Sequence, residues 1–328
     1  MSDVQSGASK GEAASPGDAL TVVFSFLSRP DSTPLDQRRR GEGFMLDHNG
    51  SPMMNPATDP STNAFGSDAN VNFEKWGEYW RKVHGERFVY VEDPNDDSLK
   101  HLQRYDQIHR LPSGPTNFMM PPYRAPVNDK GALFPTVIGH IADYRRPRWD
   151  GVAYLNFARP EDIPLVLGTP RVRFKILPED LTIFRDIAPI LAKQYIVKPS
   201  ETGGEAVALV ETHVRRAGLE REEFQRLWLL QAGGIMASPD AARYVKRYVQ
   251  LHNIGPRSPG QPLFHPQSSL IDGVTLMSFA NMNDLESYVA SSAMNVESDI
   301  MDDGQRELWA GLNYTVLNRI AEEVATKR

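Results

Sequence analysis

The sequence predicts an α+β fold in which two ferredoxin-like units of the β-α-β-β-α-β type pack sheet to sheet and enclose a barrel-like space. Three landmarks that recur in the same order in both halves support this prediction. A helix carries Trp76 and Trp80 in the first half and Phe224 and Trp228 in the second. A Tyr-x-Gln-x-His strand and then an Asp-Gly-Val strand follow each helix. This order indicates an internal duplication, and the bare sheet faces of the two units would pack against each other.

The repeat divides the chain into four expected segments. Residues 1–18 are rich in Ser, Gly and Ala and are expected to form a disordered tail. The first unit is expected at residues 19–195, followed by a linker at 196–205 that contains a proline and two glycines. The second unit takes residues 206–328. It is expected to end in an amphipathic helix at 307–324, because apolar residues recur there at three- and four-residue steps.

The first unit begins with an apolar run at 20–27, which predicts a buried strand. The segment 29–70 is a long insertion rich in Pro, Asn, Asp, Ser and Gly, and it either folds over a cavity as a lid or is disordered. Apolar residues at helical spacing predict a helix over 72–84. The remaining elements are expected to be a strand at 134–141, a strand at 149–157 and a helix that begins within 160–167.

The Tyr-x-Gln-x-His strand places three polar side chains on one face in each half. Side chains of a strand alternate between its two faces, so the opposite face of the second copy carries Val249 and Leu251. We expect the polar face to line the space between the halves, and the alternative is an ordinary solvated sheet face. The side chains concerned are Tyr105, Gln107 and His109 in the first copy and Tyr248, Gln250 and His252 in the second.

Composition limits the classes of function. The formal net charge is -6 and the arginines are scattered, which argues against a nucleic-acid partner. The chain has no cysteine, which excludes disulfides and cysteine nucleophiles and fits a cytoplasmic protein. The apolar run at 19–27 is too short to cross a membrane and lacks the flanks of a signal peptide. We expect no membrane partner and a monomer or homodimer.

The first half resembles the EthD family of the dimeric α+β barrel superfamily. The resemblance rests on the helix FEKWGEYWRKVHG at 73–85, on Tyr105 and His109 four residues apart, and on the Asp-Gly-Val strand. It covers about residues 19–185 and, more weakly, 206–300. The second half departs from the pattern, because Ala232 stands where His84 would fall. The resemblance therefore implies a degenerate second half, with any chemistry of the helix histidine confined to the first.

The candidate catalytic residues are His84, His109 and Tyr105. His84 lies near the expected end of its helix, where the helix dipole favours an imidazolium that could donate a proton. The alternative for His84 is a helix-capping histidine without chemistry. His109 could serve as general base, with Tyr105 orienting a substrate oxygen. The alternative for this pair is a buried hydrogen-bond network that only joins the halves.

Further residues are expected to bind the substrate rather than react with it. No helix carries a His-x-x-x-His or Glu-x-x-His pair, so no metal site is expected. No cofactor is expected either, although haem stays open because it needs only one axial histidine. The candidate substrate-binding residues are Trp80, Gln107, His140, Glu211, His213, Tyr248, Gln250 and His252.

The favoured function is a cofactor-independent lyase that acts on a hydrophobic, aromatic or phenolic small molecule by dehydration or decarboxylation. Aromatic residues and methionines at 44–54 and 118–123 would exclude water from its site. One alternative is a cofactor-free or haem-dependent monooxygenase, which the superfamily also contains. The other is a non-catalytic accessory or ligand-binding protein of an oxygenase system. Fold alone does not separate these three.

Overall fold

The computed structural model describes most of the two predicted units. The expected tail at 1–18, the insertion at 29–70 except residue 29, the aromatic segment at 118–123, the strand at 134–141 and His140 lie outside the described residues. The described residues are 19–29, 73–90, 93, 95–111, 149–201, 204–291, 299–302, 305–320 and 323–326.

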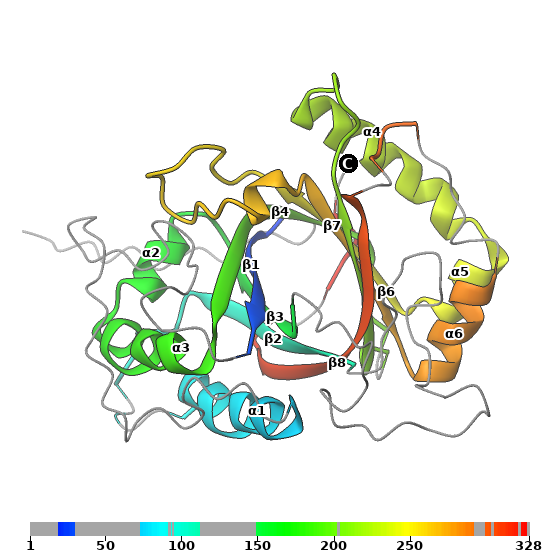
Figure 1. Cartoon of the computed structure of the whole chain (residues 1–328). Helices are drawn as coiled ribbons and strands as arrows, with labels where there is room; N and C mark the ends of the chain where they lie inside the picture. The colour runs from blue at the N-terminus through cyan, green and yellow to red at the C-terminus, as the bar shows by residue number, and fades with distance from the viewer. Residues whose placement is uncertain are drawn as a thin grey trace, which may run out of the picture.

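Eight antiparallel strands form one closed barrel (Figure 1). Around the barrel the order is β1-β3-β2-β8-β5-β7-β6-β4, and β4 pairs with β1 to close it. The two halves of the chain therefore meet at two seams, β2 with β8 and β4 with β6. The strands are β1 Thr21–Ser28, β2 Leu102–Arg110, β3 Gly151–Phe157, β4 Asp186–Lys198, β5 Val207–His213, β6 Arg247–Asn253, β7 Gly273–Phe279 and β8 Glu307–Asn318.

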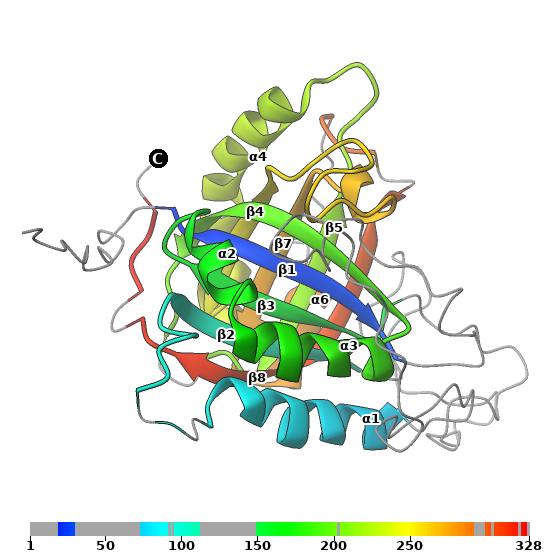
Figure 2. The same cartoon turned by 90° about the vertical axis from the view of Figure 1, so that its left-hand side faces the viewer.

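Helical segments cover the outside of the barrel, those of the first half on one side and those of the second half on the other (Figures 1 and 2). In chain order, the elements run strand, helical segment, strand, strand, helical segment, strand, and then repeat this order. The first-half segments are α1 Phe73–Tyr79, η2 Trp80–His84, η3 Gly85–Phe88, α2 Asp162–Leu167, η4 Val172–Ile176 and α3 Leu177–Ile183. The second-half segments are α4 Arg221–Met236, α5 Pro239–Tyr244, η5 Ser268–Leu270 and α6 Met282–Ala290.

The C-terminal helix predicted at 307–324 is wrong, because residues 307–318 form β8. Trp309 joins the apolar cluster inside the barrel, whereas its neighbours Leu308 and Ala310 pack on the outer face, as strand alternation requires. The apolar residues of 307–318 have helical spacing, which misled the prediction. The segment is a strand because β2 and β5 each need a partner for the barrel to close, and β8 pairs with both. The linker expected at 196–205 also begins too early, since β4 pairs with β6 up to Lys198.

One apolar cluster takes alternate residues from all eight strands, which places it inside the barrel. Trp149 of this cluster lies beyond the C-terminal end of β2, and the buried Arg104 lies near the N-terminal end of the same strand. We call these the apolar end and the polar end of the interior, and Tyr154 of the apolar cluster reaches the polar end. Among the residues of the apolar cluster are Val22, Phe24, Phe26, Ile108, Val152, Val210, Val249, Leu251, Leu276 and Trp309.

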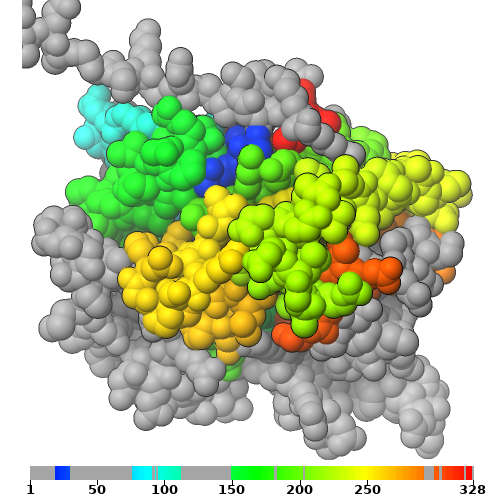
Figure 3. Space-filling view, turned by 90° about the horizontal axis from the view of Figure 1, so that it is seen from above, coloured from blue at the N-terminus to red at the C-terminus, as the bar shows by residue number. Residues whose placement is uncertain are grey.

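The segment 254–272, between β6 and β7, lies against the apolar end. Its His265 is buried and places Nε2 3.2 Å from Oδ1 of Asp186, the first residue of β4. The rings of His265 and Trp149 are 6.5 Å apart. Seen from above, the yellow and gold atoms of this segment lie beside the lime atoms of α4 (Figure 3). This end of the barrel is therefore covered by the chain itself.

The Asp-Gly-Val landmarks begin β3 and β7 and have matching partners. Asp150 accepts hydrogen bonds from the backbone N–H and the guanidinium of Arg29, at 2.8 and 2.9 Å. Asp272 accepts a backbone N–H bond from Arg215 at 2.8 Å and a guanidinium bond from Arg221 at 2.7 Å. In both halves the aspartate thus anchors the residues that follow the neighbouring strand, which is β1 in the first half and β5 in the second.

The glycine of each landmark lies beneath a tryptophan of the covering helix. A Cβ added at Gly151 would lie 2.7 Å from Trp80 Cζ3 and 2.7 Å from the carbonyl oxygen of Ile108. A Cβ added at Gly273 would meet Trp228 even more closely. Only glycine lets the indole ring approach the strand this closely, which explains why the two landmarks occur together in each half.

We predict that Gly151→Ala and Gly273→Ala each lower the free energy of unfolding by about 1–3 kcal/mol, because overpacking forces the indole or the strand to shift. Urea unfolding measured by far-UV circular dichroism tests this. Gly234→Ala in α4 is the matched control, because an added Cβ meets nothing within 4 Å there. The control should be stabilised by about 0.5–1 kcal/mol as a helix position. Similar stability changes for all three variants would contradict the packing account.

Candidate functional site

The three polar side chains of the Tyr-x-Gln-x-His strand in the first half lie on the outer face of the barrel, beneath the first helical segment. We call such a set of three, here Tyr105, Gln107 and His109, a polar rung. Gln107 Nε2 donates to the carbonyl oxygen of Trp80 and to the hydroxyl of Tyr105, both at 3.0 Å. His109 Nε2 is 3.1 Å from Gln107 Oε1. The prediction that Tyr105, Gln107 and His109 line the space between the halves is therefore wrong. Ile108, on the opposite face of β2, points inward.

The second copy repeats this arrangement. Gln250 Nε2 donates to the carbonyl oxygen of Trp228 at 3.3 Å and to the hydroxyl of Tyr248 at 2.9 Å. The His252 ring stacks on Trp228 with centroids 4.9 Å apart, as His109 stacks on Trp80 at 4.3 Å. Tyr248, Gln250 and His252 are therefore also wrongly placed by the cavity prediction. In each half, the rung joins a helix to its own sheet.

Burial controls the titration of both rung histidines. Burial, with the positive charge of Arg81 as the second cause, lowers the pKa of His109 to about 3. Burial likewise lowers the pKa of His252 to about 3, with Lys193 as the next cause. Burial also raises the pKa of the Tyr105 hydroxyl. At neutral pH both imidazoles are neutral and hydrogen-bonded, which suits a positioning role better than proton donation.

Glu211 and His213 lie on the outer face of β5, not in the interior. His213 Nε2 is 2.8 Å from the hydroxyl of Thr275, and its ring lies 4.8 Å from that of Trp228. Glu211 Oε1 is 3.7 Å from His213 Nδ1. The expectation that this pair reaches the space between the halves is therefore also wrong. The pair belongs to the packing between β5 and α4.

His84 is held between two carboxylates that sequence analysis did not single out. Its Nδ1 is 2.8 Å from Glu179 Oε2, and its Nε2 is 3.3 Å from Asp180 Oδ1. Arg87 donates to Glu179 through Nε at 2.6 Å and Nη2 at 2.9 Å, and the Tyr79 hydroxyl donates to it at 2.5 Å. The His84 and Glu179 side chains are only 3% and 9% exposed. We refer to these five residues as the His84 cluster.

The local structure explains how the His84 cluster forms. The π-helical turn η2 ends at His84, and η3 then presents Arg87 towards the same carboxylate. Glu179 and Asp180 lie in the first turn of α3, where the helix dipole favours acidic residues. In the second half Ala232 is buried in an apolar cluster. Of the two halves, only the first thus carries this histidine.

Glu179 stays ionised at neutral pH. Burial alone would raise its pKa, but hydrogen bonds from His84, Arg87 and Tyr79 outweigh burial and lower the pKa to about 2. Burial and the neighbouring carboxylate raise the pKa of Tyr79 to about 12, so its hydroxyl remains a donor. The cluster therefore contains a permanent negative charge in contact with an imidazole and a guanidinium.

A groove of about 640 Å³ lies on the other side of Arg87. Arg87 is 40% exposed and is the residue shared by the groove and the His84 cluster. Tyr90 and Phe174 also line the groove, and each is 66% exposed. The remaining lining residues are Asp93, Asn95, Asp96, Asp97, Ser98, Thr169, Pro170, Arg171, Lys175 and Ile176.

The histidines and acidic residues that the structure describes were compared with what a metal ion or a haem would need. They contain no group of three or more His, Asp or Glu side chains that could hold a metal ion. Haem needs a ring nitrogen directed at the iron. In five of the six described histidines Nε2 already contacts a protein side chain, namely in His84, His109, His213, His252 and His265. The sixth, His101, differs because it contacts Asp162 through Nδ1, at 3.1 Å, which is compatible with an axial Nε2.

No described helix is both long and apolar enough to cross a membrane.

No family model matches the sequence, and no curated protein matches it. A protein from Lactobacillus acidophilus NCFM, provisionally named a monooxygenase, is similar in structure at 8% identity and TM-score 0.43, over 90% of this chain and 94% of that one. An anthrone oxidase-like protein gives 10% identity and TM-score 0.45, over 94% and 98%. A mutant chlorite dismutase from Candidatus Nitrospira defluvii gives 10% and 0.36, over 92% and 94%. With TM-scores this low, the likenesses carry no functional argument.

Proposed function

We propose that the chain is a cofactor-independent lyase-type enzyme that removes water or carbon dioxide from an aromatic or phenolic small molecule. The observation that carries the proposal is His84, placed between Glu179 and Asp180 in the first half and replaced by Ala232 in the second. A histidine that only capped a helix would need no carboxylate at each ring nitrogen. We also infer that the two runs of elements are a duplicated ferredoxin-like unit. The EthD resemblance stays a prediction.

His84 is the proposed acid. An ionised carboxylate only accepts hydrogen bonds, so Nδ1 of His84 would donate to Glu179, and a ring that carries two protons would also place a positive charge 3.3 Å from Asp180 Oδ1. In a dehydration, the carbon–oxygen bond breaks and the leaving hydroxyl takes a proton from His84 to become water. The carbon-bound proton passes to a carboxylate, and we assign this role to Asp180. In a decarboxylation, the proton of His84 goes to the carbon that loses carbon dioxide.

The groove beside Arg87 is the proposed entrance. Because His84 is 3% exposed, a substrate reaches it only when the Arg87 side chain moves away from Glu179. Tyr90 and Phe174 offer aromatic surface at the groove, which suits a planar aromatic compound. The charges of the lining are mixed, because three aspartates accompany the basic residues and Arg171 pairs with Asp96 at 3.0 Å. His109 and Tyr105 then position the helix that carries His84, rather than the substrate.

A monooxygenase is the second candidate. Trp76, Trp80 and Phe184 form an aromatic cluster beside His109, with ring centroids 5.2–6.1 Å apart. An apolar aromatic surrounding of this kind suits an aromatic substrate that reacts with oxygen directly. Oxygen uptake that depends on an aromatic substrate would select this function. Tight ligand binding without turnover would instead select a non-catalytic accessory protein.

We predict that His84→Gln lowers turnover by at least about 100-fold, the usual contribution of a general acid. Purified protein is incubated with a panel of aromatic hydroxy compounds and aromatic carboxylic acids, and mass spectrometry detects the loss of water or carbon dioxide. His101→Gln is the matched control, because His101 also pairs with one carboxylate, Asp162, at 3.1 Å. The control should keep its activity. Equal turnover in wild type and His84→Gln would remove His84 from the mechanism.

We predict that Glu179 makes folding stability depend on acidic pH. Its folded pKa of about 2 lies below the ordinary value of 4.5, so its contribution is fully present above about pH 4.5 and is lost as pH falls through about 2. Urea unfolding should show Glu179→Gln less stable than wild type by about 1–2 kcal/mol at pH 7, allowing for solvent screening. The difference should shrink towards pH 2. The exposed Glu222→Gln serves as control, and a difference independent of pH would contradict the prediction.

A further inference from the structure

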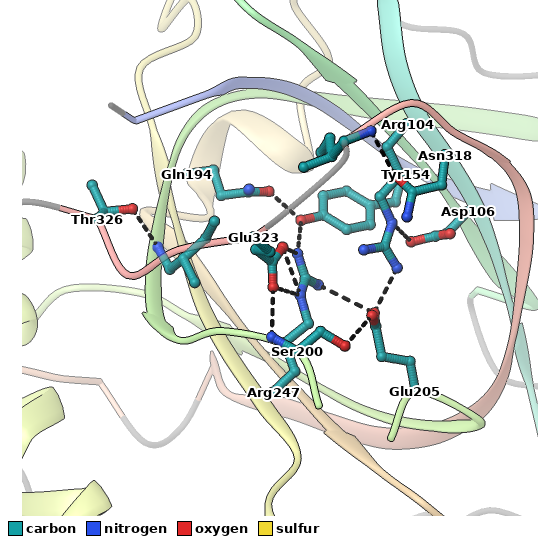
Figure 4. Close-up of polar contacts among 12 residues, drawn as sticks. Arg104, Asp106, Tyr154, Gln194, Ser200, Glu205, Arg247, Asn318, Glu323 and Thr326 are labelled. Carbon is teal, nitrogen blue, oxygen red and sulfur yellow. Dashed lines mark hydrogen bonds and ion pairs between the residues drawn. The ribbon is translucent and has the colours of Figure 1, made fainter. Parts of the chain in front are cut away.

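The polar end of the barrel interior holds a network of buried charges (Figure 4). Arg247 donates to Glu323 and lies over the ring of Tyr154, with its Cζ 5.8 Å from the ring centroid. Arg104 donates to Asp106 at 2.7 Å and to Glu205 at 2.5 Å. Both arginines come from barrel strands, whereas Glu205 and Glu323 come from the segments that follow β4 and β8.

Glu323 is bound like a ligand. Its two oxygens accept hydrogen bonds from Arg247 Nε at 3.0 and 2.8 Å and from Nη2 at 2.6 Å. The backbone N–H of Ser200 donates to the same carboxylate at 2.9 Å. A second anchor lies three residues on, where Thr326 exchanges two hydrogen bonds with Ile196, at 2.8 and 2.9 Å. Together these contacts hold the segment 323–326 against the end of the barrel.

Several buried polar atoms on the strands that carry Arg104 and Tyr154, and on β4, have no protein hydrogen-bond partner. Neither the oxygen nor the nitrogen of the Asn156 side-chain amide is hydrogen-bonded, although Asn156 is completely buried. Gln194 Nε2 and Asp106 Oδ1 are in the same state, and both side chains are buried. Tyr154, two residues before Asn156 on the same face of β3, donates to Gln194 Oε1. Buried polar groups are rarely left unpaired, so this region calls for a polar occupant such as water or a small ligand.

The position of Glu323 is one that a carboxylate fits. Two arginines face the carboxyl groups of Asp106, Glu205 and Glu323; burial raises the pKa of Asp106, and Arg104, which donates to it at 2.7 Å, opposes that rise. Nearby arginines lower the pKa values of Glu205 and Glu323 against the effect of burial, so these two stay ionised. If Glu323 withdrew, Arg247 would be left buried with one distant carboxylate, Glu205 at 3.8 Å. An uncompensated buried guanidinium is costly, and a small anion would relieve that cost.

We propose that the polar end of the barrel is a binding site for small carboxylates, separate from the His84 cluster, and that Glu323 is its built-in occupant. The guanidinium of Arg247 and the N–H of Ser200 hold the carboxylate, as they hold Glu323 in the structure. The unpaired groups of Asn156 and Gln194 offer donors and acceptors to the rest of the molecule. This site does not depend on the proposed lyase activity.

The test is chemical rescue of full-length Glu323→Ala by acetate. The variant should melt about 4–8 °C below wild type, because it leaves Arg247 without its main partner. Sodium acetate at about 0.1 M should restore at least about 2 °C of this loss, compared with sodium chloride at equal ionic strength. The double variant Glu323→Ala, Arg247→Gln should show no rescue. Glu222→Ala, which removes an exposed carboxylate paired with Arg257, should show neither loss nor rescue.

A measurement on the wild-type chain covers the case in which the Glu323→Ala variant does not fold. About 0.5 M acetate, in excess of the effective concentration of Glu323, should displace the segment 323–326. Hydrogen exchange at the N–H groups of Ile196 and Thr326 should then become at least about threefold faster than in chloride. The proposal is overturned if acetate rescues the variant no more than chloride does, or if exchange in the wild type is the same in both salts.

Discussion

Closure of the eight-stranded barrel is the constraint from which the other features follow. A closed barrel has one interior, and alternate side chains of every strand must fill it. Here the apolar face of each strand supplies the filling at one end, so β2 turns Ile108 inward and His109 outward. The polar rungs are then buried under helices and need partners there. Gln107 and Gln250 find them in a helix carbonyl, a tyrosine and a histidine. The rungs are thus a consequence of closure.

The repeated features and the unique features of the two halves have different roles. The Trp–Gly contact, the Tyr-Gln-His rung and the aspartate that anchors an arginine occur twice with the same geometry. Because these contacts occur in both halves, we attribute them to the packing of helix on sheet and not to catalysis. The His84 cluster has no second copy, because Ala232 packs into an apolar cluster at the corresponding position. This asymmetry is why we place chemistry at His84 and packing at His109 and His252.

Most of the described scaffold could be predicted from the sequence, whereas contacts between distant segments could not. The strands around Tyr105, Asp150 and Tyr248 were correctly predicted, and the helix predicted over 72–84 is helical from Phe73 to His84, because periodicity and repeated landmarks are local signals. β8 was missed because its apolar spacing suits a helix, and only the open edges of β2 and β5 require a strand. The inward face of β2 could not be chosen either, since alternation gives two faces but not which one meets the core. Glu179 escaped notice because 95 residues separate it from His84.

The distribution of charge inside the barrel bears on what the fold is for. An apolar interior of the same volume would hold the barrel together at least as well, since buried ion pairs seldom add net stability. The polar end nevertheless keeps Arg104 and Arg247 buried and leaves the Asn156 amide unpaired. Two of its carboxylates, Glu205 and Glu323, come from the segments that follow β4 and β8, so they can leave without breaking a strand pairing. A scaffold built only for rigidity has no need of this arrangement, whereas an interior that exchanges its occupant does.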